Sequence, residues 1–403
     1  MAGDPMRIPN TPSAHLTYCL NVHPGSTLEE AETAIFERAK AVFSRFSAAV
    51  GAAGPYGLGL WLSADAARAL EAPGRLDAFA ARIESAGFYV FTLNGFPYSR
   101  FHGVRVKERV YQPDWADPAR RDYTLLLARI LARLLPEGVR GTISTLPVTY
   151  KPWVNTDKLD ASARHIAEVA AALATLRRQS GKDIALALEP EPGCFLERTE
   201  DVLDFEAAYL AKRGGDLLRQ EHGLGAAEAT QVLRRHVGIC LDTTHAGVMF
   251  ENPTDILARL TTNRIRVSKI QLGAALKVQV GKDGPPDALR AFQDEVYLHQ
   301  VMVATAEGKR YFADLPDALA EGKTLRGEWR VHFHVPLSWP GDGPIATTSP
   351  LVDSEFLNAA LRAGCEHFES EIYTLDVFPG LRGSAEAVLA QDLAWLWERL
   401  TQR

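Results

Sequence analysis

The stretch VGICLDTTHAGVMF, residues 237–250, decides how the fold is interpreted. It begins with an almost continuous apolar run and then brings in Asp242 and His245. An apolar run without alternation is typical of a strand that is buried on both faces of a parallel sheet. Polar residues that follow such a strand lie at its carboxyl end, where α/β barrels form their active sites.

Seven further runs of this kind occur along the chain, and segments with helical periodicity separate them. The eight runs span residues 15–23, 56–63, 88–96, 141–148, 183–191, 237–245, 265–273 and 367–375. A last helical segment, SAEAVLAQDLAWLWERL, follows the eighth run. Eight strand–helix units predict a (β/α)₈ TIM barrel. A doubly wound sheet is disfavoured because no GxGxxG motif follows the first strand.

One connection is much longer than the others and runs from Leu272 to Glu366. It contains VYLHQVMVATAEGKRYFADL, which predicts a β-hairpin that turns at 306–309, and WRVHFHVPLSW, which predicts an extra strand. We interpret residues 272–366 as an insertion between strands seven and eight, so that the whole chain, 1–403, forms a single domain. Ser26 and Glu29 predict a capping box before the first helix.

The composition excludes some classes of protein. The chain has 403 residues, of which 46% are hydrophobic and 23% charged, and its net charge of −6 argues against a nucleic-acid partner. There is no apolar run of about 18 residues, so no membrane insertion is expected. The amino-terminal segment has no apolar core typical of a signal peptide. The four cysteines form no CxxC pair, and three of them lie in or beside apolar runs, which predicts reduced core thiols in a cytoplasmic protein.

Polar residues also follow the other predicted strands. They are Asn94, Tyr98, Arg100 and His102 after the third strand, Lys151 and Trp153 after the fourth, Glu189 and Glu191 after the fifth, Gln271 on the seventh, and Glu369 and Glu371 on the eighth. The extra strand adds His332 and His334, which face one side because they are two residues apart. Since the carboxyl ends of barrel strands meet at one mouth, these side chains are expected to gather there.

Several carboxylates at one barrel mouth repel one another unless some are protonated or a cation neutralises them. Glu189, Asp242 and Glu371, with Gln271 or His334 as a neutral ligand, therefore predict a divalent metal site. Oxygen ligands favour Mn²⁺ or Mg²⁺, and a histidine ligand brings Zn²⁺ or Co²⁺ into range. The substrate pocket is expected to be lined by Asn94, Tyr98, His102, Lys151, Trp153 and His332.

Each of these residues also has a purely structural interpretation. Asp242 can cap the following helix, and His245 can be a buried, hydrogen-bonded histidine. Glu189 and Glu191 can be acidic residues of a loop. Glu191 fits such a role, or that of an acid hydrogen-bonded behind the metal ligands, better than the role of a metal ligand. Gln271 can be a hydrogen-bonding amide at the edge of the core. Glu371 can form a salt bridge to Lys151 or Arg100. The joint occurrence of polar residues on strands five to eight is what favours a site.

The motifs LALEPEP, CLDTTHA and ESEIYT resemble those of the xylose-isomerase-like TIM barrels, a superfamily of sugar isomerases and epimerases. The resemblance implies a divalent metal held by Glu189, Asp242 and Glu371, and it implies that His245 touches the substrate. KIQLG departs from the pattern, because Gln271 stands where the superfamily usually has histidine. The fourth ligand is therefore either Gln271 or His334.

A resemblance over nearly the whole chain is to the metabolite-traffic protein EboE family. It is carried by LTYCLNVHPG, YGLGLWLS, FTLNGFPY, STLPVTYKPW, HFHVPLSW and EIYTLDVFP, in this order. That family is associated with the handling of a metabolite precursor, which implies a small polyol-like ligand.

The resulting expectation is a metal-dependent isomerase or epimerase of a small hydroxy-carbonyl metabolite. Glu189 and Glu371 would exchange a proton with the substrate, and His245 would hold a substrate oxygen. The main alternative is a non-catalytic metabolite-binding protein on the same barrel. A metal-dependent hydrolase is a third hypothesis, and the absence of a basic stripe disfavours nucleic acid as its substrate.

Overall fold

Eight parallel strands form a barrel in the computed structural model, which describes residues 7–9, 11, 13–322 and 324–401. Their order is β1-β13-β7-β6-β5-β4-β3-β2, and a bridge from Cys19 to Gly59 joins the two outer strands. The strands are β1 (His15–Tyr18), β2 (Tyr56–Trp61), β3 (Phe88–Asn94), β4 (Gly141–Thr145), β5 (Ile184–Leu188), β6 (Val237–Asp242), β7 (Val267–Leu272) and β13 (His367–Ser370). The predicted TIM barrel is confirmed, and β6 is buried along its whole length, as its apolar run predicts.

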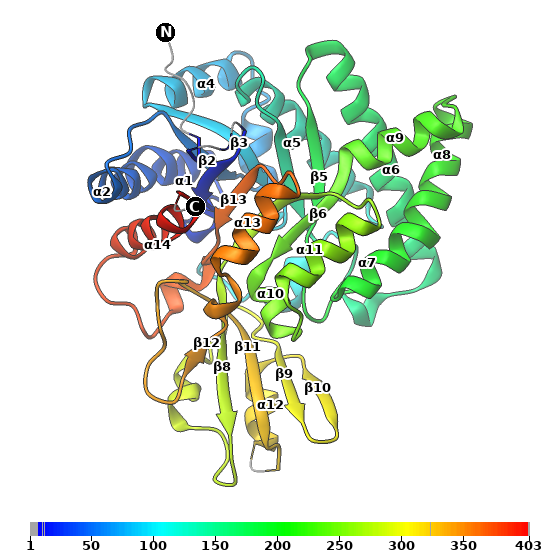
Figure 1. Ribbon diagram of the computed structural model, residues 1–403. Coiled ribbons are helices and arrows are strands. Elements are labelled where there is room, and N and C mark those ends of the chain that lie inside the picture. Colours follow the sequence, from blue (N-terminus) through cyan, green and yellow to red (C-terminus); the bar gives the residue numbers. More distant parts are fainter. Residues whose placement is uncertain (1–6, 10, 12, 323, 402–403) are drawn as a thin grey trace.

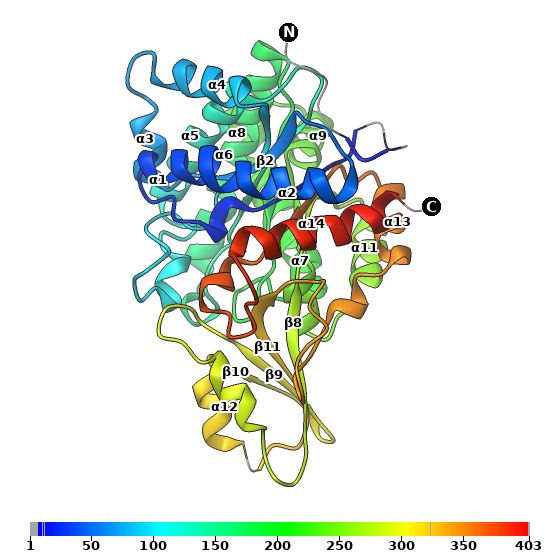
Figure 2. The ribbon, with the colours of Figure 1, turned by 90° about the vertical axis from the view of Figure 1, so that its left-hand side faces the viewer.

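Helices cover the outside of the barrel (Figure 1). The longer ones are α2 (Lys40–Val50), α4 (Arg75–Ser85), α5 (Pro118–Leu134), α6 (Thr156–Ser180), α9 (Ala226–His236), α11 (Pro253–Thr262), α13 (Ser354–Arg362) and α14 (Ala385–Thr401). The shorter ones are α1 (Leu28–Thr33), α3 (Ala64–Ala69), α7 (Thr199–Phe205), α8 (Gly215–Glu221) and α10 (Thr243–Val248). Helix α14 packs against α2, where Trp397 meets Phe46 edge-on with ring centroids 5.7 Å apart (Figure 2). The last helix therefore closes the ring beside the first.

The capping box of the first helix is shifted by one residue from the prediction. Thr27 is the N-cap and Glu30 is its partner, in place of Ser26 and Glu29. The Thr27 hydroxyl accepts a hydrogen bond from the backbone N–H of Glu30 at 3.2 Å. The Glu30 carboxylate accepts from the backbone N–H of both Thr27 and Ser26. The shift arises because both registers read as a hydroxyl followed three residues later by glutamate, and the backbone settles which one forms.

The insertion lies within the predicted bounds but has more strands than predicted, and it forms a five-stranded antiparallel sheet of order β10-β9-β11-β8-β12. These strands, with the helix beside them, are β8 (Ala274–Val280), β9 (Val301–Thr305), β10 (Gly308–Phe312), β11 (Gly327–Val335), β12 (Ala346–Thr347) and α12 (Leu315–Glu321). The predicted hairpin is β9–β10 and the predicted extra strand is β11, whereas β8 and β12 were not predicted. The sheet projects from one end of the barrel in both ribbon views (Figures 1 and 2).

Strand β8 was missed because it follows β7 with only Gly273 between them. A Cβ atom at Gly273 would lie 2.7 Å from the Thr244 hydroxyl and 2.9 Å from the backbone oxygen of Glu371. Glycine is therefore the residue that lets the chain leave the barrel this close to the mouth.

Two further expectations concern composition. All four cysteines are buried and free. Within the described residues, no helix combines the length and the apolarity that crossing a membrane would take.

Candidate metal centre

Seven of the polar residues expected at the barrel mouth lie together and are buried. Glu189 directly follows β5, Asp242 ends β6, Gln271 lies on β7, and Glu371 directly follows β13. His245 lies in α10, and His332 and His334 lie on β11 of the insertion. The exposed fraction of each of these seven residues is 4% or less. The barrel brings the acids together, and the inserted sheet adds two imidazoles.

Asp242 uses its two carboxylate oxygens differently. Oδ1 caps α10, because it accepts hydrogen bonds from the backbone N–H of Thr244 at 2.6 Å and of His245 at 3.1 Å. Oδ2 is buried and has no hydrogen-bond partner among the described residues. A buried carboxylate oxygen without a partner is costly, which makes it a candidate ligand atom for a cation. The structural and the functional interpretations of this residue are therefore compatible.

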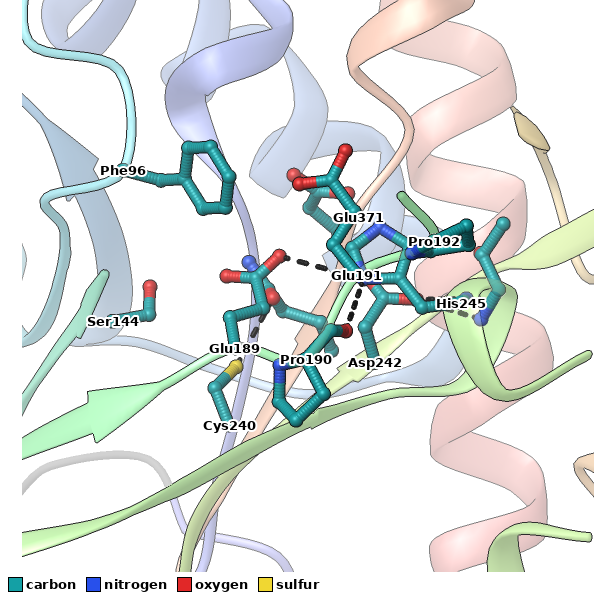
Figure 3. Close-up of polar contacts among 12 residues, drawn as sticks. Phe96, Ser144, Glu189, Pro190, Glu191, Pro192, Cys240, Asp242, His245 and Glu371 are labelled. Carbon is teal, nitrogen blue, oxygen red and sulfur yellow. Dashed lines mark hydrogen bonds and ion pairs between the residues drawn. The ribbon is translucent and has the colours of Figure 1, made fainter. Parts of the chain in front are cut away.

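Glu189 contacts Gln271 and lies near His245, which is drawn beside it in Figure 3. With the orientation of the Gln271 amide assigned from its partners, its NH₂ group donates to both Glu189 oxygens, at 2.9 and 2.8 Å. The Nδ1 atom of His245 lies 4.0 Å from Glu189 Oε1. Burial raises the pKa of Glu189 well above its usual value, and the negative charges of Glu371 and Asp242 raise it further. A cation beside these three acids would remove that repulsion.

Glu371 is held by residues that are distant in sequence. The side-chain amide of Asn21 donates to its Oε1 at 2.7 Å. His334 Nδ1 lies 2.8 Å from its Oε2 and donates to its backbone oxygen at 3.1 Å. Burial pushes the pKa of the Glu371 carboxyl up, but the positive charge of His334 outweighs this and leaves the pKa below its usual value. Burial lowers the pKa of His334, but the negative charge of Glu371 outweighs this and raises the pKa to about 9.

Glu191 belongs to a separate hydrogen-bonded group beside the acids. The Tyr111 hydroxyl donates to Glu191 Oε1 at 2.7 Å, and Gln300 Nε2 donates to the Tyr111 hydroxyl at 2.9 Å. Gln300 also accepts from His332 Nδ1 at 2.6 Å. Burial raises the pKa of Glu191 to about 8. The residue is 6% exposed and lines the same cavity as Glu189 and His245.

Three groups of side chains have the spacing of a metal site. They are Glu189–Asp242–His245, Asp242–His334–Glu371 and His245–His332–His334, and within each group one ligand atom per residue lies within 4.8 Å of the others. Asp242, with its unpartnered oxygen, is common to the first two groups. The donor set of carboxylate oxygens and imidazole nitrogens fits Mn²⁺, Co²⁺ or Zn²⁺, so the residues present fit the metal that the sequence predicts.

The residues expected to line the pocket are divided between two places. Asn94 and His332 line a cavity of about 50 Å³ together with Glu189, His245 and Glu371. His102 lies beside it and donates from Nε2 to the backbone oxygen of Asn21 at 2.5 Å.

Tyr98, Lys151 and Trp153 do not line that cavity. Tyr98 and Trp153 line a wider surface groove, in which the Tyr98 hydroxyl accepts from Arg68. Lys151 is exposed and pairs with Glu197 at 2.5 Å. The salt bridge from Glu371 to Lys151 or Arg100, weighed from the sequence, does not form, because Glu371 pairs with Asn21 and His334.

Other residues of the cavity were missed from the sequence. Asn21, Tyr111, Tyr297 and Tyr373 are among them. Asn21 had a detectable signal, because it stands at the polar end of the first apolar run, as Asp242 does on the sixth. The three tyrosines lie in irregular or 3₁₀ segments, where no periodicity marks them.

The fold is similar to that of xylose-isomerase-like TIM barrel proteins of known structure. A xylose isomerase-like TIM barrel protein from Mycobacterium smegmatis, in complex with magnesium, is 11% identical over 98% of each chain, with a TM-score of 0.52. An L-ribulose 3-epimerase is 12% identical over 96% of this chain and 94% of that chain, with a TM-score of 0.48. The IolI protein with a bound zinc atom is 12% identical over 96% and 98%, with a TM-score of 0.47.

At these identities the likeness shows the fold and not the activity. No family model and no curated protein matches the sequence.

Proposed function

We propose that this protein binds a divalent metal ion at the barrel mouth and catalyses the isomerisation or epimerisation of a small hydroxy-carbonyl metabolite. The observation that carries the proposal is Asp242, whose buried Oδ2 has no partner among the described residues and belongs to two groups with ligand spacing. The M. smegmatis barrel, which has the same fold, is in complex with magnesium.

In this proposal the ligands are the carboxylates of Glu189, Asp242 and Glu371. Gln271 and His334, the two candidates for the remaining place, then support the carboxylates from behind. Gln271 donates to Glu189, and His334 lies against Glu371. Such outer hydrogen bonds orient metal ligands and sharpen their affinity.

The residues of the chain then have distinct tasks. A bound divalent ion supplies Lewis-acid polarisation of a carbonyl and the neighbouring hydroxyl. Glu189 and Glu371 come from strands that β6 and β7 separate, so they reach the substrate from different sides and can each exchange a proton with it. His245 lines the cavity and would hold a substrate oxygen.

The test is solvent deuterium exchange into a panel of small ketoses and polyol-derived ketones, with Mn²⁺ or Zn²⁺ present. We expect exchange with the wild-type protein and a loss of about 10²–10⁴ in rate in Glu371→Gln, because the amide keeps the shape but cannot transfer the proton. Glu366→Gln is the matched control, since Glu366 precedes the same strand at its opposite end. Unchanged exchange in Glu371→Gln would remove that residue from the mechanism.

A second candidate function is a non-catalytic metabolite-binding protein, in line with the resemblance to the EboE family. Gln271 favours it, because an amide stands where the superfamily usually has a histidine ligand. In both cases the ligand is a polyol-like metabolite, and the protein acts as a single domain in the cytoplasm. Tight binding of a polyol without deuterium exchange would favour this candidate over the enzyme.

A further inference from the structure

Three buried histidines converge beside the acids. His245 comes from α10, and His332 and His334 come from β11 of the inserted sheet. Their ring centroids are 4.6, 5.3 and 5.0 Å apart for the pairs 245–332, 245–334 and 332–334. One ring nitrogen of each lies within 4.8 Å of the other two. Two elements far apart in sequence thus place three imidazoles around one point.

The Nδ1 atom of each ring is already engaged by an oxygen that can only accept. The pairs are His245 with the backbone oxygen of Pro190 (2.9 Å), His332 with the amide Oε1 of Gln300 (2.6 Å), and His334 with the backbone oxygen of Glu371 (3.1 Å). Each Nδ1 must therefore carry the hydrogen and donate it. The orientation of the Gln300 amide is fixed, because its NH₂ group donates to Pro192 and Tyr111.

Because Nδ1 carries the hydrogen, the lone pair of each neutral imidazole lies on Nε2. A histidine ligand of a metal almost always donates its other ring N–H in this way, which fixes the tautomer and the ring direction. One such histidine is ordinary, and three in one cluster form a ligand set.

The Nε2 atoms of His332 and His334 lie 2.9 Å apart. Two lone pairs at this separation repel, so either a proton or a metal ion must lie between them. Two neighbouring nitrogen ligands of a tetrahedral zinc ion, each at about 2.0–2.1 Å, are about 3.3–3.4 Å apart, so a shift of about 0.4 Å between the two rings would give the spacing of metal ligands. The arrangement of the two rings therefore suits a bound metal as well as a shared proton.

We propose that the Nε2 atoms of His245, His332 and His334 form a second metal site, separate from the carboxylates, for Zn²⁺ or a similar transition metal. Imidazole ligands favour such metals over Mg²⁺, and three ligands leave a coordination position open. Asp242 belongs to both of the other groups with ligand spacing, one with His245 and one with His334, so a carboxylate lies within reach of both sites. Paired metal sites about 3.5–4 Å apart are well suited to such a shared carboxylate.

This site goes beyond the proposed function and does not rest on it. It changes one part of that function, because a substrate oxygen would occupy the open position of the histidine-bound metal and would not bind His245 itself. Two of its three ligands come from the insertion, so a barrel without the insertion could not form it.

The test is electron paramagnetic resonance of the full chain, stripped with a chelator and loaded with one equivalent of Cu²⁺. We expect nitrogen splittings from three imidazoles in the wild-type protein. The copper spectrum of His332→Gln should show one nitrogen ligand fewer. The variant should also bind Zn²⁺ at least about 10–100-fold more weakly, because the loss of an outer hydrogen-bond partner alone has an effect of that size. Gln300→Leu, which removes the anchor of His332 together with the hydrogen bonds from Gln300 to Tyr111 and Pro192, should weaken Zn²⁺ binding within the same range.

The matched control is His165→Gln. His165 is also buried and also donates from Nδ1 to a backbone oxygen, that of Trp115 at 2.8 Å, but it lies in α6 away from the cluster. Its substitution should leave the copper spectrum unchanged. A wild-type spectrum without nitrogen splittings would overturn the proposal and leave a shared proton as the explanation, and this measurement needs no variant to fold.

The same samples separate this proposal from the proposed function. Mn²⁺ binding should persist in His332→Gln and should be lost in Asp242→Asn. If Mn²⁺ neither binds nor supports deuterium exchange while the copper signal remains, the proposed function fails and the histidine site stands.

Discussion

Lys269 and Glu369 place two full charges inside the barrel, where neither side chain is exposed. Lys269 Nζ lies 2.6 Å from Glu369 Oε2 and donates to the Ser144 hydroxyl at 3.1 Å. Burial lowers the pKa of Lys269, but the negative charge of Glu369 outweighs this and raises the pKa above its usual range. Gly59 leaves the space for the pair, because a Cβ atom there would overlap with Glu369 Oε1. Removing one of the two charges would strand the other in the core.

Lys269→Met should lower the free energy of unfolding by about 3–5 kcal/mol, because it leaves Glu369 buried without its partner. The double variant Lys269→Met/Glu369→Leu should lose much less, since no charge remains to be buried. Urea unfolding of the metal-free protein measures both. Arg129→Met, at an exposed pair with Glu71, is the control and should cost about 0–1 kcal/mol. Equal losses in the single and the double variant would contradict this account.

At the scale of elements, Asp183 ties several of them together at the amino end of β5. Its carboxylate lies 3.1 Å from the Arg140 guanidinium before β4 and 2.8 Å from that of Arg235 in α9. Arg177 in α6 lies 3.9 Å away. Burial alone would raise the pKa of Asp183, but Arg235 and Arg140 outweigh this and lower the pKa below its usual value. The ionised carboxylate therefore stabilises the fold.

The sign of the pH dependence follows from that lowered pKa. The stabilisation is present at neutral pH and above the unfolded value of about 3.9, and it is lost as the pH falls through the lower value of the folded state. Asp183→Asn should therefore lower the free energy of unfolding by about 1 kcal/mol at pH 7, because the group is partly exposed. The difference from the wild-type protein should shrink near pH 3. Denaturant unfolding at both pH values checks this, and a difference that does not vary with pH would contradict it.

At the scale of the whole molecule, the candidate ligands come from both parts of the structure. Glu189, Asp242 and Glu371 belong to the barrel, whereas His332 and His334 belong to the inserted sheet. A bound metal would therefore hold the sheet to the barrel mouth. Because a metal that binds only the folded state raises stability by mass action, its removal should be visible in thermal unfolding.

Protein stripped with a chelator should melt at a lower temperature than protein with Mn²⁺ or Zn²⁺. At a hundredfold excess over the dissociation constant the gain is about 2.7 kcal/mol, which for a chain of this length is a shift of about 3 °C. Asp242→Asn should lose most of the response. Asp376→Asn should keep it, since Asp376 is half exposed and lies 3.7 Å from His102, outside the cluster. A stripped protein that shows no shift with any divalent ion would leave the metal-free binding protein as the better description.

The sequence by itself determined the barrel. Eight apolar runs separated by helical segments specify eight parallel strands, because a strand that is buried on both faces has apolar residues at nearly every position. The positions of Glu189, Asp242 and Glu371 at strand ends follow from the same local pattern. The barrel then brings the carboxyl ends to one mouth, so gathering of these acids could be expected before any contact was seen.

Only the tertiary structure decided which side chains meet there. Asn21 and Glu371 are 350 residues apart and share a hydrogen bond. His332 and His334 reach the acids because β11 pairs with β8, a strand that the sequence did not reveal. Periodicity records which face of an element is buried, but not what packs against that face. Contacts between segments distant in sequence depend on how whole elements pack, and no local pattern encodes them.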